Sequence, residues 1–182
     1  LFDDIVPAPA SGNLGATEHD AAPQTEFTHA LLAWQRHLAP GATLLFCPTP
    51  YCGRMAGNVA SSRYLRHLGT HLDPAVHVMW TGPEIVSETI APEDLRDVSD
   101  VLRRPPLIWD NLFANDYDLR RLYLGPYAGR PSALRGAVSG VLLNPNCEFA
   151  ANHLPLATFA EWIARADYEP ALAHAQIGRA HV

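Results

Sequence analysis

The sequence of 182 residues contains no lysine, and all thirteen of its basic residues are arginine. Nineteen acidic residues give a formal net charge of −6, and no basic stretch stands out along the chain. A nucleic-acid-binding surface needs clustered basic residues, so the charge argues against that class of function. The absence of lysine, together with abundant alanine, is typical of a GC-rich coding sequence, and we expect a bacterial source.

Long hydrophobic runs and metal-binding patterns are missing as well. No apolar run approaches the roughly 18–20 residues that a membrane-spanning helix needs, so we predict no membrane segment. The three cysteines fit no metal spacing, and an odd number is a poor disulfide framework. Cys47 and Cys147 lie in apolar runs, which predicts buried, reduced thiols, and the nine histidines show no ligand spacing. We therefore predict no metal and no cofactor.

The two ends of the chain differ from those of a natural open reading frame. There is neither an initiator methionine nor a signal-peptide pattern, so the sequence predicts no localisation. The chain starts inside strand-like residues, LFDDI. Residues 177–182, IGRAHV, match the translation of a common sequencing adapter, and we expect them to be an artefact. These features predict a fragment.

Between the ends, the composition is that of a globular protein with one core, 48% hydrophobic and 18% charged. Short apolar, β-rich runs recur at the spacing of βα units, roughly 30 to 40 residues apart. These strand-like runs are residues 1–2, 43–47, 76–80, 106–110 and 138–143. Alternation with helical patterns predicts an α/β fold with a parallel sheet covered on both faces.

Each helical pattern carries an apolar stripe. Residues 25–38 begin at Thr25, a predicted N-cap, and residues 91–104 have Pro92 near the first helical position. The other two patterns cover residues 58–72 and 155–166. The predicted inward residues are, in chain order, Phe27, Leu31, Trp34 and Leu38; Tyr64, Leu65, Leu68 and Leu72; Leu95, Val98 and Leu102; and Leu156, Phe159, Ala160 and Ile163. Five strands fit either an open doubly wound sheet or the last five strands of a (β/α)8 barrel, and the start within a strand favours the barrel.

Polar and aromatic residues gather after every predicted strand. They are Asp3 and Asp4, then Tyr51, then Trp109, Asn111, Asn115 and Asp116, and finally Asn144 and Asn146. Each has an ordinary structural explanation, since an acidic pair can cap a strand and Asp116 can begin a helix. Their convergence at the carboxyl ends of the strands instead predicts a binding site. Amides, carboxylates and aromatic faces suit a neutral, hydroxyl-rich ligand, and carbohydrate is the natural candidate.

Five segments, LFDDI, LFCPTPYCG, MWTGP, IWDNLFANDYDLRRLYLGPYAGRP and VLLNPNCEFAANHLPLATFAEW, resemble glycoside hydrolase family 84 in sequence and order. This is the O-GlcNAcase and bacterial β-N-acetylglucosaminidase family. The resemblance implies a (β/α)8 TIM-type barrel truncated to roughly its last five βα units, at residues 1–165. Residues 166–176 resemble the start of a following helical region. The family's early strands carry further sugar-binding groups, so we expect the chain alone to be inactive.

By this resemblance, Asp3 orients and polarises the 2-acetamido group of the substrate, and Asp4 is the general acid and then the general base. Tyr51 and Asn111 would hold the acetamido group, and Trp109 would line its pocket. Asp116 and Asn144 would bind sugar hydroxyls. Family members carry glutamate where this chain has Pro50, directly before the tyrosine.

Adjacent carboxylates favour one mechanism over another. Retaining glycosidases with an enzyme nucleophile hold two facing carboxyl groups about 5–5.5 Å apart, whereas consecutive strand residues point to opposite faces. Asp3 and Asp4 better suit substrate-assisted catalysis, in which the acetamido oxygen attacks and an oxazoline forms. Two close carboxyl groups also separate their pKa values, so that one is ionised and its neighbour protonated.

The implied function is a retaining β-N-acetylglucosaminidase, and the implied partner is a glycoconjugate or glycoprotein that bears terminal β-linked GlcNAc. Two alternatives stay open. One is a hexosaminidase that acts on glycans or hyaluronan, and the other is a non-catalytic carbohydrate-binding fragment.

Overall fold

The computed structural model describes residues 18–118 and 120–179 of the chain. The predicted strand at residues 1–2, with Asp3 and Asp4, lies outside the described residues. The elements are α1 (Glu18–Leu38), β1 (Leu45–Phe46), α2 (Gly53–Ala56), α3 (Arg63–His71), β2 (His77–Trp80), α4 (Arg96–Leu102), β3 (Leu107–Asp110), β4 (Gly140–Leu143), α5 (His153–Ala164) and α6 (Pro170–Arg179). Short 3-10 helices cover Pro92–Leu95, Ser132–Gly136 and Phe149–Asn152.

The four described strands form one parallel sheet in the order β1-β2-β3-β4. Each coincides with a predicted run, so the predicted α/β fold with a parallel sheet is confirmed. The strands follow one another in chain order without a reversal. A doubly wound sheet has a point at which the strand order reverses, and the described part of the sheet has none.

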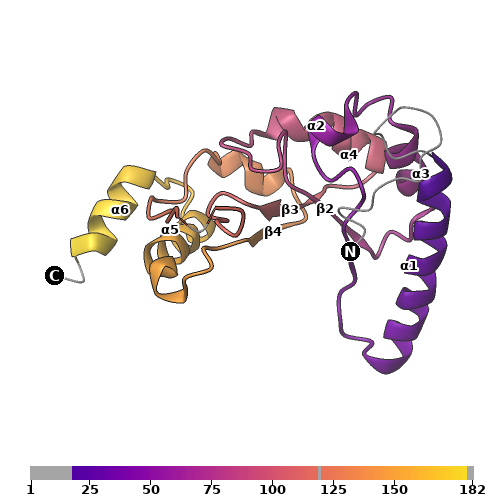
Figure 1. Ribbon diagram of the computed structural model, residues 1–182, viewed down its shortest axis with the longest axis horizontal. Coiled ribbons are helices and arrows are strands. Elements are labelled where there is room, and N and C mark those ends of the chain that lie inside the picture. Colours follow the sequence, from indigo (N-terminus) through magenta and orange to yellow (C-terminus); the bar gives the residue numbers. More distant parts are fainter. Residues whose placement is uncertain (1–17, 119, 180–182) are drawn as a thin grey trace.

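The main core lies between the sheet and the helices on one of its faces (Figure 1). Alternate strand residues such as Phe46, Val78 and Ile108 point into this core. They meet the buried stripes of α3 and α4, which contain Tyr64, Leu65, Leu68, Val98 and Leu102. The predicted inward faces of these two helices are therefore confirmed. Ser62, whose hydroxyl accepts from Leu65 N, caps α3, which begins at Arg63, five residues later than the predicted start.

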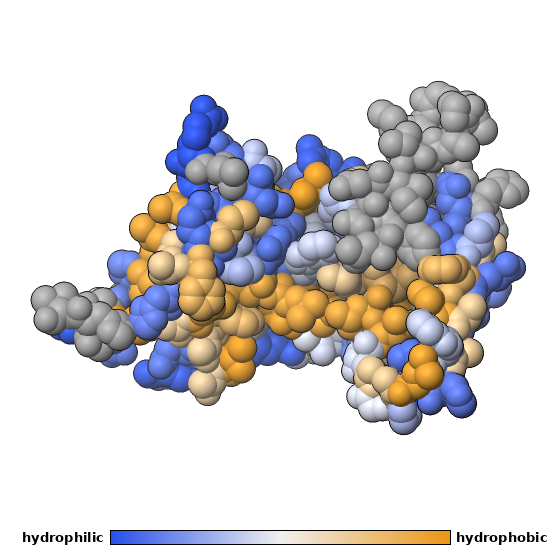
Figure 2. Space-filling model, turned by 60° about the horizontal axis from the view of Figure 1, so that its bottom comes forward, coloured by the Kyte–Doolittle hydropathy of each residue, from blue (hydrophilic) through white to orange (hydrophobic). Residues whose placement is uncertain are grey.

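The other face of the sheet carries the remaining strand residues. Cys47, Met79 and Leu107 form a small cluster there with Trp109, while Leu45 and Leu142 are exposed. Figure 2 shows apolar residues gathered in a band across one side of the molecule. The prediction that helices cover both faces is thus wrong for the described residues. All the crossovers among them place their helices on the same side, as in a singly wound sheet.

The prediction for α1 is wrong in its start and in its buried face. The helix begins at Glu18, and Thr25 lies inside it with its hydroxyl donating to Ala21 O at 2.8 Å. Phe27 and Trp34, predicted to point inward, are 55% and 62% exposed. The buried side is instead Ala21, Gln24, Thr25, Thr28 and Leu32. Polar residues can line it because the threonine hydroxyls donate to carbonyls one turn earlier.

The buried face of α5 also differs from the prediction. Leu156 and Ile163 are exposed, and Pro155, Thr158 and Trp162 are buried instead. The indole N–H of Trp162 donates to Arg130 O at 2.8 Å, so a loop ahead of the helix determines which side faces inward. No described helix is long and apolar enough to cross a membrane.

Two smaller predictions can also be compared with the structure. None of the three cysteines, which all lie in the described part of the chain, forms a disulfide; Cys47 is buried as predicted, but Cys147 is exposed because it lies in the loop after β4 rather than in the strand. At the C-terminal end, α6 runs through residue 176, where we predicted a boundary. The division at residues 165 and 176 stays a prediction.

Candidate functional site

A hollow of about 310 Å³ opens at the carboxyl ends of the parallel strands. Tyr51 enters it after β1, Trp109 and Asn111 at the end of β3, and Asn144 directly after β4, while Asp116 comes from the loop after β3. These are the five predicted ligand-binding residues that lie in the described part of the chain. The rest of the lining is Thr81, Ile85, Val86, Ala114 and Tyr117. The volume lies in the range of about 300–1,000 Å³ that is usual for small-molecule pockets.

Asn111 and Asn144 form a hydrogen-bonded amide pair inside this hollow. Asn144 Nδ2 donates to Asn111 Oδ1 at 3.0 Å, and Asn111 Nδ2 donates to Ile85 O at 2.8 Å. These bonds use one N–H and one lone pair of the Asn111 amide. A primary amide has two of each, so Asn111 can still donate to a ligand and accept from one.

A buried polar network holds the loop that carries Tyr51. Gln24 on α1 donates to Thr49 Oγ1 at 2.9 Å, and the Tyr64 hydroxyl donates to Gln24 Oε1 while it accepts from Thr49 N. Burial raises the pKa of Tyr64 to about 12, so this hydroxyl keeps its proton at neutral pH. Tyr51 O accepts from Thr81 N at 2.8 Å, which ties the loop to the one after β2. The network explains the polar inner side of α1.

A buried ion pair lies next to the residues of the hollow, at Asp110 between Trp109 and Asn111, and no sequence pattern predicts it. Asp110, the last residue of β3, and Arg130 have fully buried side chains with 2.6 Å between Oδ1 and Nη2. The Tyr127 hydroxyl donates to Asp110 Oδ2 at 2.7 Å. The pKa of Tyr127 is raised, mainly by burial and also by the negative charge of Asp110. The Tyr127 hydroxyl therefore keeps its proton and donates a hydrogen bond to Asp110. The sequence prediction assigned Asp110 only to the end of a strand and left Arg130 out.

Three asparagines fasten the loop that carries Asp116. Asn115 is fully buried; its Nδ2 donates to Arg121 O and Glu148, and its Oδ1 accepts from Cys147 N. Asn146 bonds to both backbone groups of Tyr123, and Asn152 bonds to Asn146. Asn115 and Asn146 thus point into the protein rather than toward a ligand. No helix follows Asp116 among the described residues, so Asp116 is not an N-cap.

Replacing Asn115 by alanine is expected to destabilise the protein by about 1–3 kcal/mol, because three hydrogen bonds made by one fully buried side chain are lost. Thermal or urea unfolding of the full-length protein measures the loss. The matched control is Asn58→Ala, which removes one exposed bond to Ser61 N and should change stability by no more than about 0.5 kcal/mol. Equal losses in the two variants would show that the Asn115 bonds do not hold the loop.

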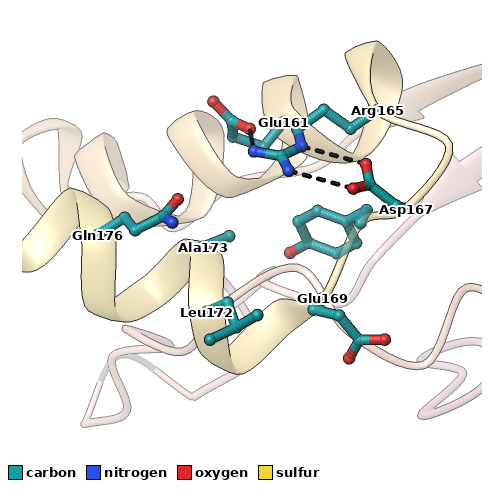
Figure 3. A pocket seen from close by; sticks show the side chains of 8 residues that line it. Glu161, Arg165, Asp167, Glu169, Leu172, Ala173 and Gln176 are labelled. Carbon is teal, nitrogen blue, oxygen red and sulfur yellow. Dashed lines mark hydrogen bonds and ion pairs between the residues drawn. The ribbon is translucent and has the colours of Figure 1, made fainter.

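Another hollow, of about 40 Å³, lies between α5 and α6 and differs in character. In Figure 3 the guanidinium of Arg165 points between the carboxylates of Glu161 and Asp167, at 3.7 and 3.3 Å. Three of its charged side chains, Glu161, Arg165 and Asp167, are paired with one another on the surface, so we do not assign this hollow a ligand. Among residues 18–118 and 120–179, no group of three or more histidine, cysteine or acidic residues is placed to hold a metal ion.

The sequence is similar to a known family and to single proteins within it. The sequence model of a family described as beta-N-acetylglucosaminidase matches residues 1–177. The protein O-GlcNAcases of Mus musculus and Rattus norvegicus are each 44% identical to this chain over 167 residues. That region is 89% of this chain but 18% of each relative, so the chain spans less than a fifth of their length.

Two solved structures resemble the fold closely. An aspartate-to-asparagine mutant of the Thermobaculum terrenum O-GlcNAc hydrolase superposes with a TM-score of 0.78 at 33% identity, over 86% of this chain and 33% of that one. The protein CpGH84B superposes with a TM-score of 0.76 over 85% of this chain and 28% of that one. At 24% identity, the second likeness supports the fold alone.

Proposed function

The chain belongs to glycoside hydrolase family 84, the β-N-acetylglucosaminidases, and from this premise we propose that it forms the C-terminal part of the catalytic domain of a retaining β-N-acetylglucosaminidase. The substrate we propose is terminal β-linked GlcNAc on a glycoconjugate or glycoprotein, as in the O-GlcNAcases. The reaction is substrate-assisted and passes through an oxazoline.

The observation that carries this proposal is the convergence of Tyr51, Trp109, Asn111, Asp116 and Asn144 on one hollow. These residues span ninety-four positions of sequence, and three different loops bring them together. The set contains two amides, a carboxylate, a phenol and an indole, and it has no cationic member. Such a lining fits an uncharged ligand with many hydroxyls and one apolar face.

Within this site we propose the roles that the family resemblance implies. Asn111 and Tyr51 hold the 2-acetamido group, and Trp109, which packs on the small cluster of Met79 and Leu107, lines the pocket for its methyl group. Asp116 is exposed at the outer side of the hollow, where its carboxylate accepts hydrogen bonds from sugar hydroxyls. Asn144 is fixed by its bond to Asn111 and binds a further hydroxyl.

The chemical step belongs to Asp3 and Asp4. Asp3 stays ionised and accepts the acetamido N–H, which increases the electron density on the carbonyl oxygen as that oxygen attacks the anomeric carbon. Asp4 donates its proton to the leaving oxygen and then takes a proton from the water that opens the oxazoline. Both displacements occur at the anomeric carbon, so the configuration is retained.

We also propose that the chain supplies the C-terminal part of a (β/α)8 barrel, at residues 1–165. Two observations support this. All described crossovers lie on one side of the sheet, and the apolar residues Leu45 and Leu142 on its other side are exposed, as the inner face of an unclosed barrel would be. The outward stripe of α1, with Phe27 and Trp34, would be covered by a helix of an earlier βα unit.

The full-length protein is expected to hydrolyse an aryl β-N-acetylglucosaminide and to release the β-anomer first, which proton NMR of the early product detects. Hyaluronan and a panel of β-GlcNAc-bearing glycans and glycopeptides, compared by kcat/KM, separate the O-GlcNAcase from the glycan-directed hexosaminidase. Release of the α-anomer would contradict a retaining mechanism. Sugar binding by calorimetry without any hydrolysis would favour the non-catalytic alternative.

A further inference from the structure

We propose that Arg130 is a positioning residue of the sugar site: through Asp110, it fixes the Asn111 amide in the orientation that binds the 2-acetamido group. This inference rests on the proposed function for the role of Asn111, and on the described contacts for everything else.

Asp110 is held by donors on both of its carboxylate oxygens. Arg130 Nη2 donates to Oδ1 at 2.6 Å and Arg130 Nε to Oδ2 at 2.8 Å, which is a two-point contact of the guanidinium fork. The Tyr127 hydroxyl completes the set on Oδ2, and Leu112 N donates to Oδ1 at 3.1 Å. The carboxylate therefore cannot rotate without breaking several buried bonds.

The bond from Leu112 N transmits this rigidity to Asn111. It closes a turn from the side chain of residue 110 to the backbone of residue 112, so it fixes the backbone of the residue between them. Trp109 precedes the same turn, in the strand. The carbonyl of Asp110 also accepts from Asn144 N at 2.8 Å, which brings the second amide of the pair beside the first.

Arg130 also holds the loop after β2, which accepts a hydrogen bond from the Asn111 side chain. Its guanidinium donates to Ser87 O at 2.8 Å and Glu88 O at 2.6 Å, in the loop after β2. The same loop supplies Ile85 O, the acceptor for Asn111 Nδ2. One arginine thus connects both partners that set the Asn111 amide: the turn that carries it and the loop that receives its N–H.

Gly129, directly before Arg130, allows the chain to pass close to the loop after β2. Gly129 has a φ of +72°, and a Cβ atom there would lie 2.3 Å from Glu88 O. Gly129 O accepts from Ile90 N at 2.9 Å, so the chain runs directly against the loop after β2. This close approach places the guanidinium within hydrogen-bonding distance of the carbonyls of Ser87 and Glu88 and of the buried carboxylate of Asp110.

Lysine cannot replace this arginine. An ammonium is a compact charge with no planar fork, so it cannot make the two parallel bonds to Asp110 and still reach two separate carbonyls. A buried ion pair is also weak support for stability, because desolvation offsets much of its attraction. The role of the Asp110–Arg130 pair is therefore to orient Asn111, since stability alone does not explain a buried ion pair.

The test compares Arg130→Lys with the matched control Arg104→Lys in the full-length protein. Arg104 also donates to backbone carbonyls, those of Leu72, Asp73 and Val76, but at the opposite ends of the strands. Calorimetric titration measures the binding of two glucose-configured iminosugars that differ only in a 2-acetamido or a 2-hydroxyl group. The ratio of the two dissociation constants reports the acetamido contact and does not depend on the folded fraction.

We expect Arg130→Lys to lower this preference for the acetamido ligand at least about tenfold, because a small misplacement of a positioning group is costly. Tyr127→Phe removes one donor from Asp110 and should lower the preference about two- to tenfold, which keeps the inference testable if the lysine variant does not fold. Arg104→Lys should leave it unchanged. An unchanged preference in Arg130→Lys or in Tyr127→Phe, measured on folded protein, overturns the inference. A wild-type protein without any preference for the acetamido ligand overturns the proposed function instead.

Discussion

A plain aryl β-glucoside is expected to be hydrolysed at least about 10⁵-fold more slowly than the matching β-N-acetylglucosaminide by the full-length protein. In the proposed reaction, the nucleophile is the carbonyl oxygen of the substrate itself. Intramolecular nucleophiles reach effective molarities of about 10⁵–10⁸ M, and the glucoside lacks this group. General acid–base help contributes about 10²–10⁴-fold and cannot replace a missing nucleophile.

Fluorination of the acetamido group gives a graded form of the same experiment. Each fluorine withdraws electron density from the carbonyl oxygen while the size of the group barely changes. The rate constant should therefore fall progressively from acetamido to trifluoroacetamido when chemistry limits the rate. An oxazoline-mimicking thiazoline should bind more tightly than substrate, because it resembles the intermediate. A flat rate across the fluorinated series would mean that an enzyme carboxylate attacks the anomeric carbon.

The Asn111 amide is held in the way that its proposed role in binding the acetamido group requires. The Asn111 amide is fixed by Ile85 O on one side and by Asn144 on the other, so it is oriented before a ligand arrives. An oriented dipole does not have to reorganise when charge develops on the acetamido group. The loss on removing the acetamido group is thus expected mainly in kcat/KM, where the transition state is compared with free enzyme and substrate.

The strands and the residues that line the hollow could be predicted because both depend on local sequence. A buried parallel strand is a short apolar run, and the residues that follow it must lie at the carboxyl edge of the sheet. Tyr51, Asn111 and Asn144 each come within a few residues of such a run, so their meeting in one hollow follows from the topology.

The buried faces of α1 and α5 could not be predicted in the same way. The 3.6-residue period identifies an apolar stripe but not the direction in which it points. On α1 the inward side is polar because Gln24 reaches Thr49 and Tyr64, which are distant in sequence. On α5 the indole of Trp162 is drawn inward by Arg130 O. In both helices, hydrogen bonds to residues distant in sequence determine which side is buried.

The buried positions of Arg130 and Asn115 could not be predicted from residue type alone. An arginine in a glycine- and proline-containing loop ordinarily faces solvent, and only a contact with Asp110, twenty positions earlier, shows that this one is buried. Asn115 stands one position from Asp116 and has the same hydrogen-bonding groups as Asn111. Its inward orientation depends on Glu148 and Cys147 of another loop, which no local pattern encodes.

Asp3 and Asp4 are expected to fail differently when each is replaced by asparagine in the full-length protein. Asp4→Asn removes the proton donor to the leaving oxygen, so kcat/KM should fall about 10²–10⁴-fold for a substrate with a poor leaving group. An activated aryl glycoside needs little protonation and should be partly spared. Asp3→Asn weakens the internal nucleophile, so the first step should slow by a similar factor for both kinds of substrate.

The slope of log kcat/KM against the pKa of the leaving phenol separates the two roles. Asp4→Asn should steepen this slope, because the leaving oxygen departs with more negative charge, whereas Asp3→Asn should leave it close to that of the wild type. Asp100→Asn is the matched control; it makes the same substitution on the exposed side of α4 and should change neither slope nor rate. Equal slopes for the Asp3 and Asp4 variants would rule out this division of labour, since a facing pair or a single shared proton would then describe the two carboxylates better.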